Sequence, residues 1–273
     1  YGVRVDSTSV SIITNSMMGP LKEWQSRPLE EVYFVVWMDG ILIKIRPNGK
    51  VHYKTVYLVI RLTQEGKKQV LGMWISETES ASFWMTVLTD LKARGVKDIL
   101  IACTDNLSSF TEAIKGAFPQ ADTQLRIVHQ VRNSLRYVVW KDNKEFAVDM
   151  KDIYHVATFQ AAEQALEYFE KKWNHKYAYA VRSWRNNRVK LTRFFDYPPE
   201  IRKIVYTTNV IGSLNRRIRK YTKTKSVFPH DQAAHKAVYL AIANIVKKWT
   251  LPIRDRSMIL QQFLIKFENR CRI

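Results

Sequence analysis

Hydrophobic positions in the first quarter of the chain follow the pattern of β-strands. Residues 32–38 form a continuous apolar run of strand length, and residues 41–46 alternate apolar and polar side chains before a Pro-Asn-Gly turn. Two further strands are predicted at residues 55–62 and 69–75, on either side of a polar turn. We therefore expect an antiparallel meander, with the first strand ending at residue 39.

The pattern then alternates between helical and strand periods. Helical spacing of apolar residues predicts helices at 80–94 and 106–117. Short apolar runs at 98–103 and 125–129 predict strands, and the second leads into a basic helix at 130–140. Strands that are connected through helices require a partly parallel sheet, so the fold class is α/β.

Beyond residue 140 the strand pattern stops. Every segment that can be read there is an amphipathic helix, at residues 142–154, 159–173, 176–195, from 209, 231–249 and 255–268. The chain thus divides into a mixed α/β part followed by an all-α part.

Composition changes this picture by indicating a partner. The 273 residues include 44 Lys and Arg against 25 Asp and Glu, a formal charge of +19. Such an excess favours a protein that binds a polyanion, most simply nucleic acid, over one that is merely soluble at high charge. Cys103 and Cys271 give neither a metal-ligand nor a disulfide spacing, which favours a reduced cytoplasmic compartment. No apolar run is long enough to span a membrane.

Two aspartates follow predicted strands. Asp39 precedes Gly40 at the end of the first strand, and Asp105 follows the strand at 98–103. Carboxylates at neighbouring strand ends can hold two divalent cations for phosphodiester cleavage. The alternative is a turn residue and a helix cap, and residue type and position alone favour that alternative.

The helix that begins near residue 209 carries an unusual number of basic residues. They are Arg216, Arg217, Arg219, Lys220, Lys223 and Lys225. We expect them to contact DNA phosphates, although a solvated basic face is the common alternative. Arg132 and Asn133 form a second candidate surface, for which packing is an equally good explanation. Trp173 and Trp184 are expected to pack in a core rather than to stack on bases.

Five motifs occur in order along the chain and resemble one family. They are Trp-Met-Asp-Gly-Ile at 37–41, Cys-Thr-Asp-Asn-Leu-Ser-Ser-Phe-Thr-Glu-Ala-Ile at 103–114, Phe-Pro-Gln at 118–120, Ile-Val-His-Gln-Val-Arg-Asn-Ser at 127–134 and Thr-Thr-Asn-Val-Ile-Gly-Ser-Leu-Asn-Arg-Arg-Ile-Arg-Lys at 207–220. Together they resemble the Mutator-type transposases of bacterial insertion sequences, in the DDE superfamily. The resemblance extends over nearly the whole chain.

This resemblance implies an RNase H-like core interrupted by a helical insertion. The expected regions are the end of an N-terminal DNA-binding or linker region (1–30), the first part of the core (31–140), the insertion (141–206) and the last core helices (207–273). The resemblance also implies Mg²⁺, with Mn²⁺ as a substitute, and double-stranded DNA at element ends and at a target. It further implies a homodimer in the bacterial cytoplasm, associated with the nucleoid and not with a membrane.

Matched position by position, Asp39 and Asp105 correspond to the first two catalytic acids and metal ligands of the family. The third acid, a glutamate, falls on Gly212. His129 corresponds to the histidine of a Cys/Asp-x-x-His motif and is a DNA-binding candidate, but the first position of that motif is Arg126.

Other departures from the family pattern are Arg61, which interrupts an apolar strand, and Arg188 and Arg256 at positions where relatives tend to have tryptophan. Unpaired charges in packed sites are costly. We therefore expect a truncated, degenerate copy, and we expect it to be impaired in DNA cleavage and strand transfer because Gly212 replaces the third acid. The alternatives are a non-catalytic DNA-binding remnant that interferes with an active transposase, and a generic RNase H-like nuclease. The helical block disfavours the nuclease.

Overall fold

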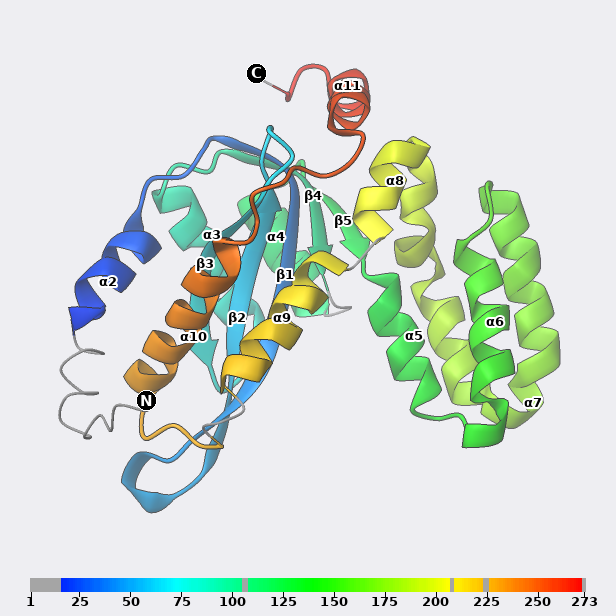
Figure 1. The fold of residues 1–273 in the computed structure, drawn as a ribbon. Helices are drawn as coiled ribbons and strands as arrows, with labels where there is room; N and C mark the ends of the chain where they lie inside the picture. Colours follow the sequence, from blue (N-terminus) through cyan, green and yellow to red (C-terminus); the bar gives the residue numbers. More distant parts are fainter. Residues whose placement is uncertain (1–15, 105–107, 207–208, 223–225, 272–273) are drawn as a thin grey trace.

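A five-stranded mixed sheet forms the centre of the computed structural model, which describes residues 16–104, 108–206, 209–222 and 226–271 (Figure 1). Its strands are β1 (Val32–Ile45), β2 (His52–Leu62), β3 (Lys68–Ser76), β4 (Asp98–Thr104) and β5 (Asp122–Leu125). The order is β3-β2-β1-β4-β5, with antiparallel pairing in the meander and parallel pairing from β1 to β5. This is the RNase H-like arrangement, as predicted.

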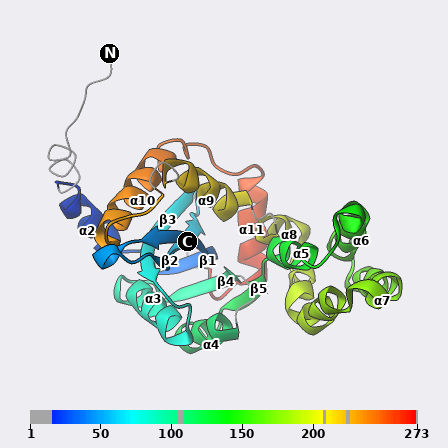
Figure 2. The ribbon, with the colours of Figure 1, turned by 90° about the horizontal axis from the view of Figure 1, so that it is seen from below.

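Helices cover both faces of the sheet, as Figure 2 shows. One face packs against α3 (Ala81–Ala93) and α4 (Ser108–Ala117), the other against α9 (Asn209–Thr222) and α10 (Asp231–Val246). In β1, Val36 and Met38 belong to the apolar core between the sheet and helices α3 and α4. Val35 and Trp37 belong to the core on the opposite face, which includes residues of α9 and α10. Because β1 is buried on both faces, its sequence is a continuous apolar run.

The remaining helices are α2 (Met18–Ser26) at the sheet margin, α11 (Arg256–Lys266) near the C-terminus, and a block beside β5. The block consists of α5 (Ile127–Leu135), α6 (Asn143–Tyr154), α7 (Phe159–Thr192) and α8 (Pro199–Tyr206). Short 3₁₀ turns lie at Pro47–Gly49, Trp140–Asp142 and Arg193–Asp196. The all-α insertion before α9 is therefore present, whereas its limits at 141 and 206 stay a prediction.

Trp173 and Trp184 hold the helical block together. Both are buried, and their indole N–H groups donate to Asp149 at 2.7 Å and to Ser134 at 2.9 Å. The ring of Phe146 packs edge-on against Trp173. Core packing, as expected, accounts for both tryptophans.

Several predicted boundaries were wrong, including that of the basic helix expected at 130–140, since α5 spans Ile127–Leu135. β1 does not end at residue 39 but continues to Ile45, because β2 pairs with it over its whole later part. The segment 125–129 is not a strand, since β5 occupies Asp122–Leu125 and α5 begins at Ile127. The segments 159–173 and 176–195 form a single helix α7, distorted at Tyr177. Among the described residues no helix has the length and apolar character needed to cross a bilayer.

Candidate active site

Asp39 lies where β1 extends past its parallel neighbour. The pairing of β1 with β4 ends at Trp37 and Cys103, whereas β1 continues through Asp39 along β2. Gly40 permits this, because a Cβ there would approach the Thr55 methyl group to 2.5 Å. Asp39 is thus beside the carboxyl end of β4, the position expected for a ligand site. Asp105, the residue directly after β4, is outside the described residues.

Both carboxylate oxygens of Asp39 accept hydrogen bonds. Oδ1 accepts from the backbone N–H of Gly40 at 2.8 Å. Oδ2 accepts from Nδ2 of Asn215 at 2.7 Å and from Nη1 of Arg126 at 3.2 Å, and Nη2 of Arg126 lies 3.1 Å away. The side chain of Arg126 is 1% exposed and that of Asp39 is 10% exposed. The acid is therefore enclosed by donors.

Arg126 is held in place at the junction of β5 and α5. Its backbone N–H donates to the carbonyl of Thr104 at 2.9 Å, and its Nη2 lies 2.8 Å from Nε2 of His129. A guanidinium can only donate, so His129 accepts through Nε2. His129 had been expected at the end of a strand. It lies instead in the first turn of α5, where it contacts Arg126.

Arg126 also lies close to Cys103, at the end of β4. Burial raises the pKa of the Cys103 thiol to about 12, although the nearby Arg126 pulls it down. Cys103 is therefore a protonated, apolar part of the core.

Helix α9 is oriented by its contact with Asp39. Asn215 is buried and reaches Asp39 from this helix, and residue 212 lies on the same face one turn earlier. A Cβ built at Gly212 meets no atom within 4 Å. Within the described ranges, the position matched to the third acid is therefore open.

A divalent cation does not fit beside Asp39 as the described residues are arranged. A metal would need free oxygen lone pairs, and Oδ2 already receives Asn215 and Arg126. Unit charges 4 Å apart interact by about 4 kcal/mol near a protein surface, and a dication doubles this, so a metal next to Arg126 would be repelled. Within the described ranges no group of three or more His, Cys, Asp or Glu could hold a metal. The residues described here do not form the expected Mg²⁺ site.

The basic residues of α9 point away from the sheet. Arg216, Arg217, Arg219 and Lys220 are exposed, and so are Arg132 and Asn133 on α5, whereas Lys223 and Lys225 lie outside the described residues. Hollows of about 380 and 440 Å³ flank α9. They add Lys248, two residues after α10, and Lys44 of β1 to this surface. Neither lysine was predicted from the sequence, because only packing brings these segments next to α9.

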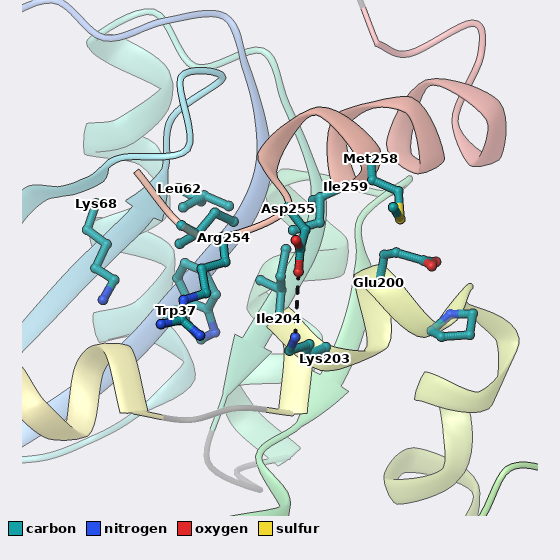
Figure 3. Close-up of a pocket in the computed structure, with 12 residues that line it drawn as sticks. Trp37, Leu62, Lys68, Glu200, Lys203, Ile204, Arg254, Asp255, Met258 and Ile259 are labelled. Carbon is teal, nitrogen blue, oxygen red and sulfur yellow. Dashed lines mark ion pairs between the residues drawn. The ribbon is translucent and has the colours of Figure 1, made fainter. Parts of the chain in front are cut away.

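A cavity of about 630 Å³ lies between α8, α11 and the sheet (Figure 3). It is lined by apolar side chains and several charged ones, among them the ion pair of Lys203 with Asp255 at 3.8 Å. Trp37 lines it as well, and Nε1 of Trp37 has no hydrogen-bond partner in the described part of the chain. Nothing in the sequence indicated this cavity, because its walls come from four separate segments.

The three arginines that the sequence analysis took as intrusions all have partners. Arg61 is buried but pairs with both carboxylate oxygens of Glu30 and donates to Gln69, while its guanidinium lies over the ring of Tyr33. Arg188 pairs with Glu163 at 2.6 Å. Arg256 donates to the carbonyl of Gln64 at 3.0 Å. The charge of Arg61 is therefore compensated, and β2 continues through it.

Comparisons with known proteins place these observations in a family. A model described as transposase, Mutator family, matches residues 1–251. The transposase for insertion sequence element ISRM3 of Rhizobium meliloti is 40% identical over 271 residues, which cover 99% of this chain and 68% of that protein. The transposase for insertion sequence element IS905 of Lactococcus lactis is 31% identical over a match that covers 85% of this chain and 59% of that protein. A solved structure of the HTLV-2 integrase catalytic core domain in complex with magnesium aligns at 13% identity and a TM-score of 0.23. The alignment covers 46% of this chain and 88% of that one.

Proposed function

The chain belongs to the Mutator family of transposases, and from this premise we propose that it binds DNA but is impaired in strand cleavage and transfer. One observation carries the proposal, the hydrogen bond from Asn215 to Asp39. This contact fixes how α9 is turned against the sheet. Position 212 lies one turn before Asn215 on the same face of α9, and the arginines of this helix are exposed to solvent.

The impairment follows from the absence of a side chain at position 212. The resemblance implies a glutamate there as the third metal ligand, and Gly212 supplies no donor atom. Loss of a charge clamp on a phosphoryl transition state costs about three orders of magnitude in rate or more. The open space around Gly212 supports this explanation, because in the described part of the chain no atom lies within 4 Å of a Cβ built there.

DNA binding is supported by the charge and its placement. The formal charge is +19, and four exposed basic residues of α9 lie next to the site. We propose that double-stranded DNA, at element ends and at the target, contacts this surface through its phosphates. A solvated face without a partner would show no steep salt dependence, whereas phosphate contacts would.

The test measures binding and cleavage on the same preparation. Fluorescence anisotropy with a labelled duplex at several salt concentrations should give a binding constant whose logarithm falls linearly with the logarithm of the salt concentration. Nicking of a supercoiled plasmid with Mg²⁺ or Mn²⁺ should stay at background. Robust metal-dependent nicking by the unmodified chain would contradict the impairment. Failure to bind any duplex at low salt would contradict the DNA-binding part.

A chain that binds DNA without cleaving it should also compete with an active relative. We expect a homodimer on the nucleoid, and mixing this chain with an active family member should lower the nicking rate of that member. Light scattering after size-exclusion chromatography tests the dimer. A generic nuclease is less well supported, since such enzymes lack the helices α6, α7 and α8.

A further inference from the structure

We propose that the guanidinium of Arg126 is the built-in counter-ion of Asp39, so that this chain folds without a divalent cation and excludes one from this carboxylate. The inference deepens the proposed function, on which it rests for the identity of the site. It adds a cause of impairment that is independent of Gly212, because it concerns the first acid and not the third.

Donors of the protein occupy both carboxylate oxygens of Asp39. Arg126 and Asn215 both reach Oδ2 of Asp39, at distances of 2.7 to 3.2 Å. Oδ1 is engaged by the N–H of Gly40. A cation that coordinated Oδ2 would have to displace the guanidinium, since a guanidinium has no lone pair to offer a metal.

Arg126 also has little freedom to leave. Its side chain is almost completely buried, and its own backbone N–H is fixed to Thr104 at the end of β4. Its Nη2 is also held by His129. Swinging outward would break these contacts and leave Asp39 as a largely buried carboxylate without its counter-ion, which is strongly unfavourable.

Arg61 provides a matched control in the same chain. Its side chain is 5% exposed and pairs with Glu30, a residue of the segment between α2 and β1. The two arginines thus share burial and a carboxylate partner, but only Arg126 contacts the acid of the candidate active site. A change specific to the site should appear at Arg126 and not at Arg61.

The first measurement needs no change at Arg126. Mn²⁺ is titrated into the unmodified chain and into Asp39→Asn, with free Mn²⁺ followed by electron paramagnetic resonance. We expect the two titrations to coincide, because Asp39 takes no part in metal binding. Tighter Mn²⁺ binding by the unmodified chain than by Asp39→Asn would overturn the proposal.

The second measurement removes the counter-ion. Melting temperatures are recorded with and without Mn²⁺ for the unmodified chain, Arg126→Gln, Arg126→Lys and Arg61→Gln. Mn²⁺ should raise the melting temperature of Arg126→Gln only, with binding at least about tenfold tighter than that of the unmodified chain. Arg126→Lys keeps the charge and should stay insensitive. Equal insensitivity of a folded Arg126→Gln would contradict the proposal, and if this variant does not fold, the first titration decides.

These outcomes separate the inference from the proposed function. Metal binding at Asp39 in the unmodified chain would remove the counter-ion role but leave DNA binding and the absence of nicking untouched. Loss of the proposed DNA binding would leave the metal titrations unchanged.

Discussion

Arg61 and Arg126 are both buried arginines that pair with a carboxylate, but they belong to different regions of the molecule. Arg61 lies at the end of β2, and its partner Glu30 comes from a neighbouring loop and is 53% exposed. Arg126 lies at the carboxyl end of the parallel strands, and its partner is Asp39, which is 10% exposed. The same residue type therefore meets an exposed acid in one region and, in the other, the nearly buried acid that the family resemblance matches to the first catalytic position.

The difference shows that a charged residue at an apolar position has to be judged by its partner. At Arg61 the charge is compensated by Glu30, an exposed acid outside the proposed site. At Arg126 the charge is compensated as well, but by Asp39, the acid that the proposed metal site would need. We propose that the same physical compensation has a functional cost only in the second region.

Arg126 and Arg61 should differ most in their effect on DNA nicking. Gly212→Glu combined with Arg126→Asp should raise Mn²⁺-dependent plasmid nicking by about three orders of magnitude, because it supplies the third acid and frees the first. Gly212→Glu alone should gain little, since Arg126 still engages Asp39. Gly212→Glu with Arg61→Gln is the matched control and should resemble the single variant. Full activity of Gly212→Glu by itself would refute this view of Arg126.

Arg126 and Arg61 should also differ in how much they contribute to stability. Arg126→Gln should lower the free energy of unfolding by about 3–5 kcal/mol, because Asp39 is left buried without its counter-ion. Arg61→Gln should cost only about 1–2 kcal/mol, since water can solvate the half-exposed Glu30. Urea unfolding of both variants in metal-free buffer measures the difference. Equal losses would mean that burial of the partner does not decide the cost.

A third prediction extends the comparison to arginines that are exposed. Arg216→Ala with Arg219→Ala should weaken DNA binding for all sequences alike and reduce the magnitude of the salt slope by about 2, because two phosphate contacts are lost. Lys92→Ala with Lys115→Ala removes two exposed charges from the opposite face of the sheet and serves as the control. Anisotropy titrations at several salt concentrations measure the affinity and its salt slope. Equal values for the two double variants would argue against α9 as the DNA-binding surface.

The smallest effect concerns the thiol beside Arg126. A pKa of about 12 leaves only about one part in ten thousand of Cys103 as thiolate at pH 8, so alkylation there requires local opening. Arg126→Gln should raise the labelling of Cys103 relative to Cys271 several-fold, and Arg61→Gln should not. Labelling should increase with pH in both variants, because thiolate is the reactive form. Mass spectrometry of the two peptides measures the ratio, and an unchanged ratio in Arg126→Gln would argue against local loosening.

Much of the secondary structure was predicted from the sequence. The meander, the helix before β4 and the change to helices after residue 140 all follow from periodicity, which depends on neighbours within a few positions. The same local character explains the errors. Residues 39–40 looked like a strand end because Asp and Gly are turn residues, whereas pairing with β2 carries the strand through them. Distant pairing outweighed local preference there.

The pattern of residues along the chain was enough for the fold class and for the basic residues of α9, whereas the roles matched to Asp39 and Gly212 stay predictions from the family resemblance. Only the tertiary structure decided that Arg126 pairs with Asp39, that Arg61 is compensated and that Trp37 lines a cavity. The physical reason is separation along the chain, since Arg126 and Asn215 lie 87 and 176 residues from Asp39. Periodicity specifies which face of an element is buried, but the partner that a buried charge meets depends on how distant elements pack.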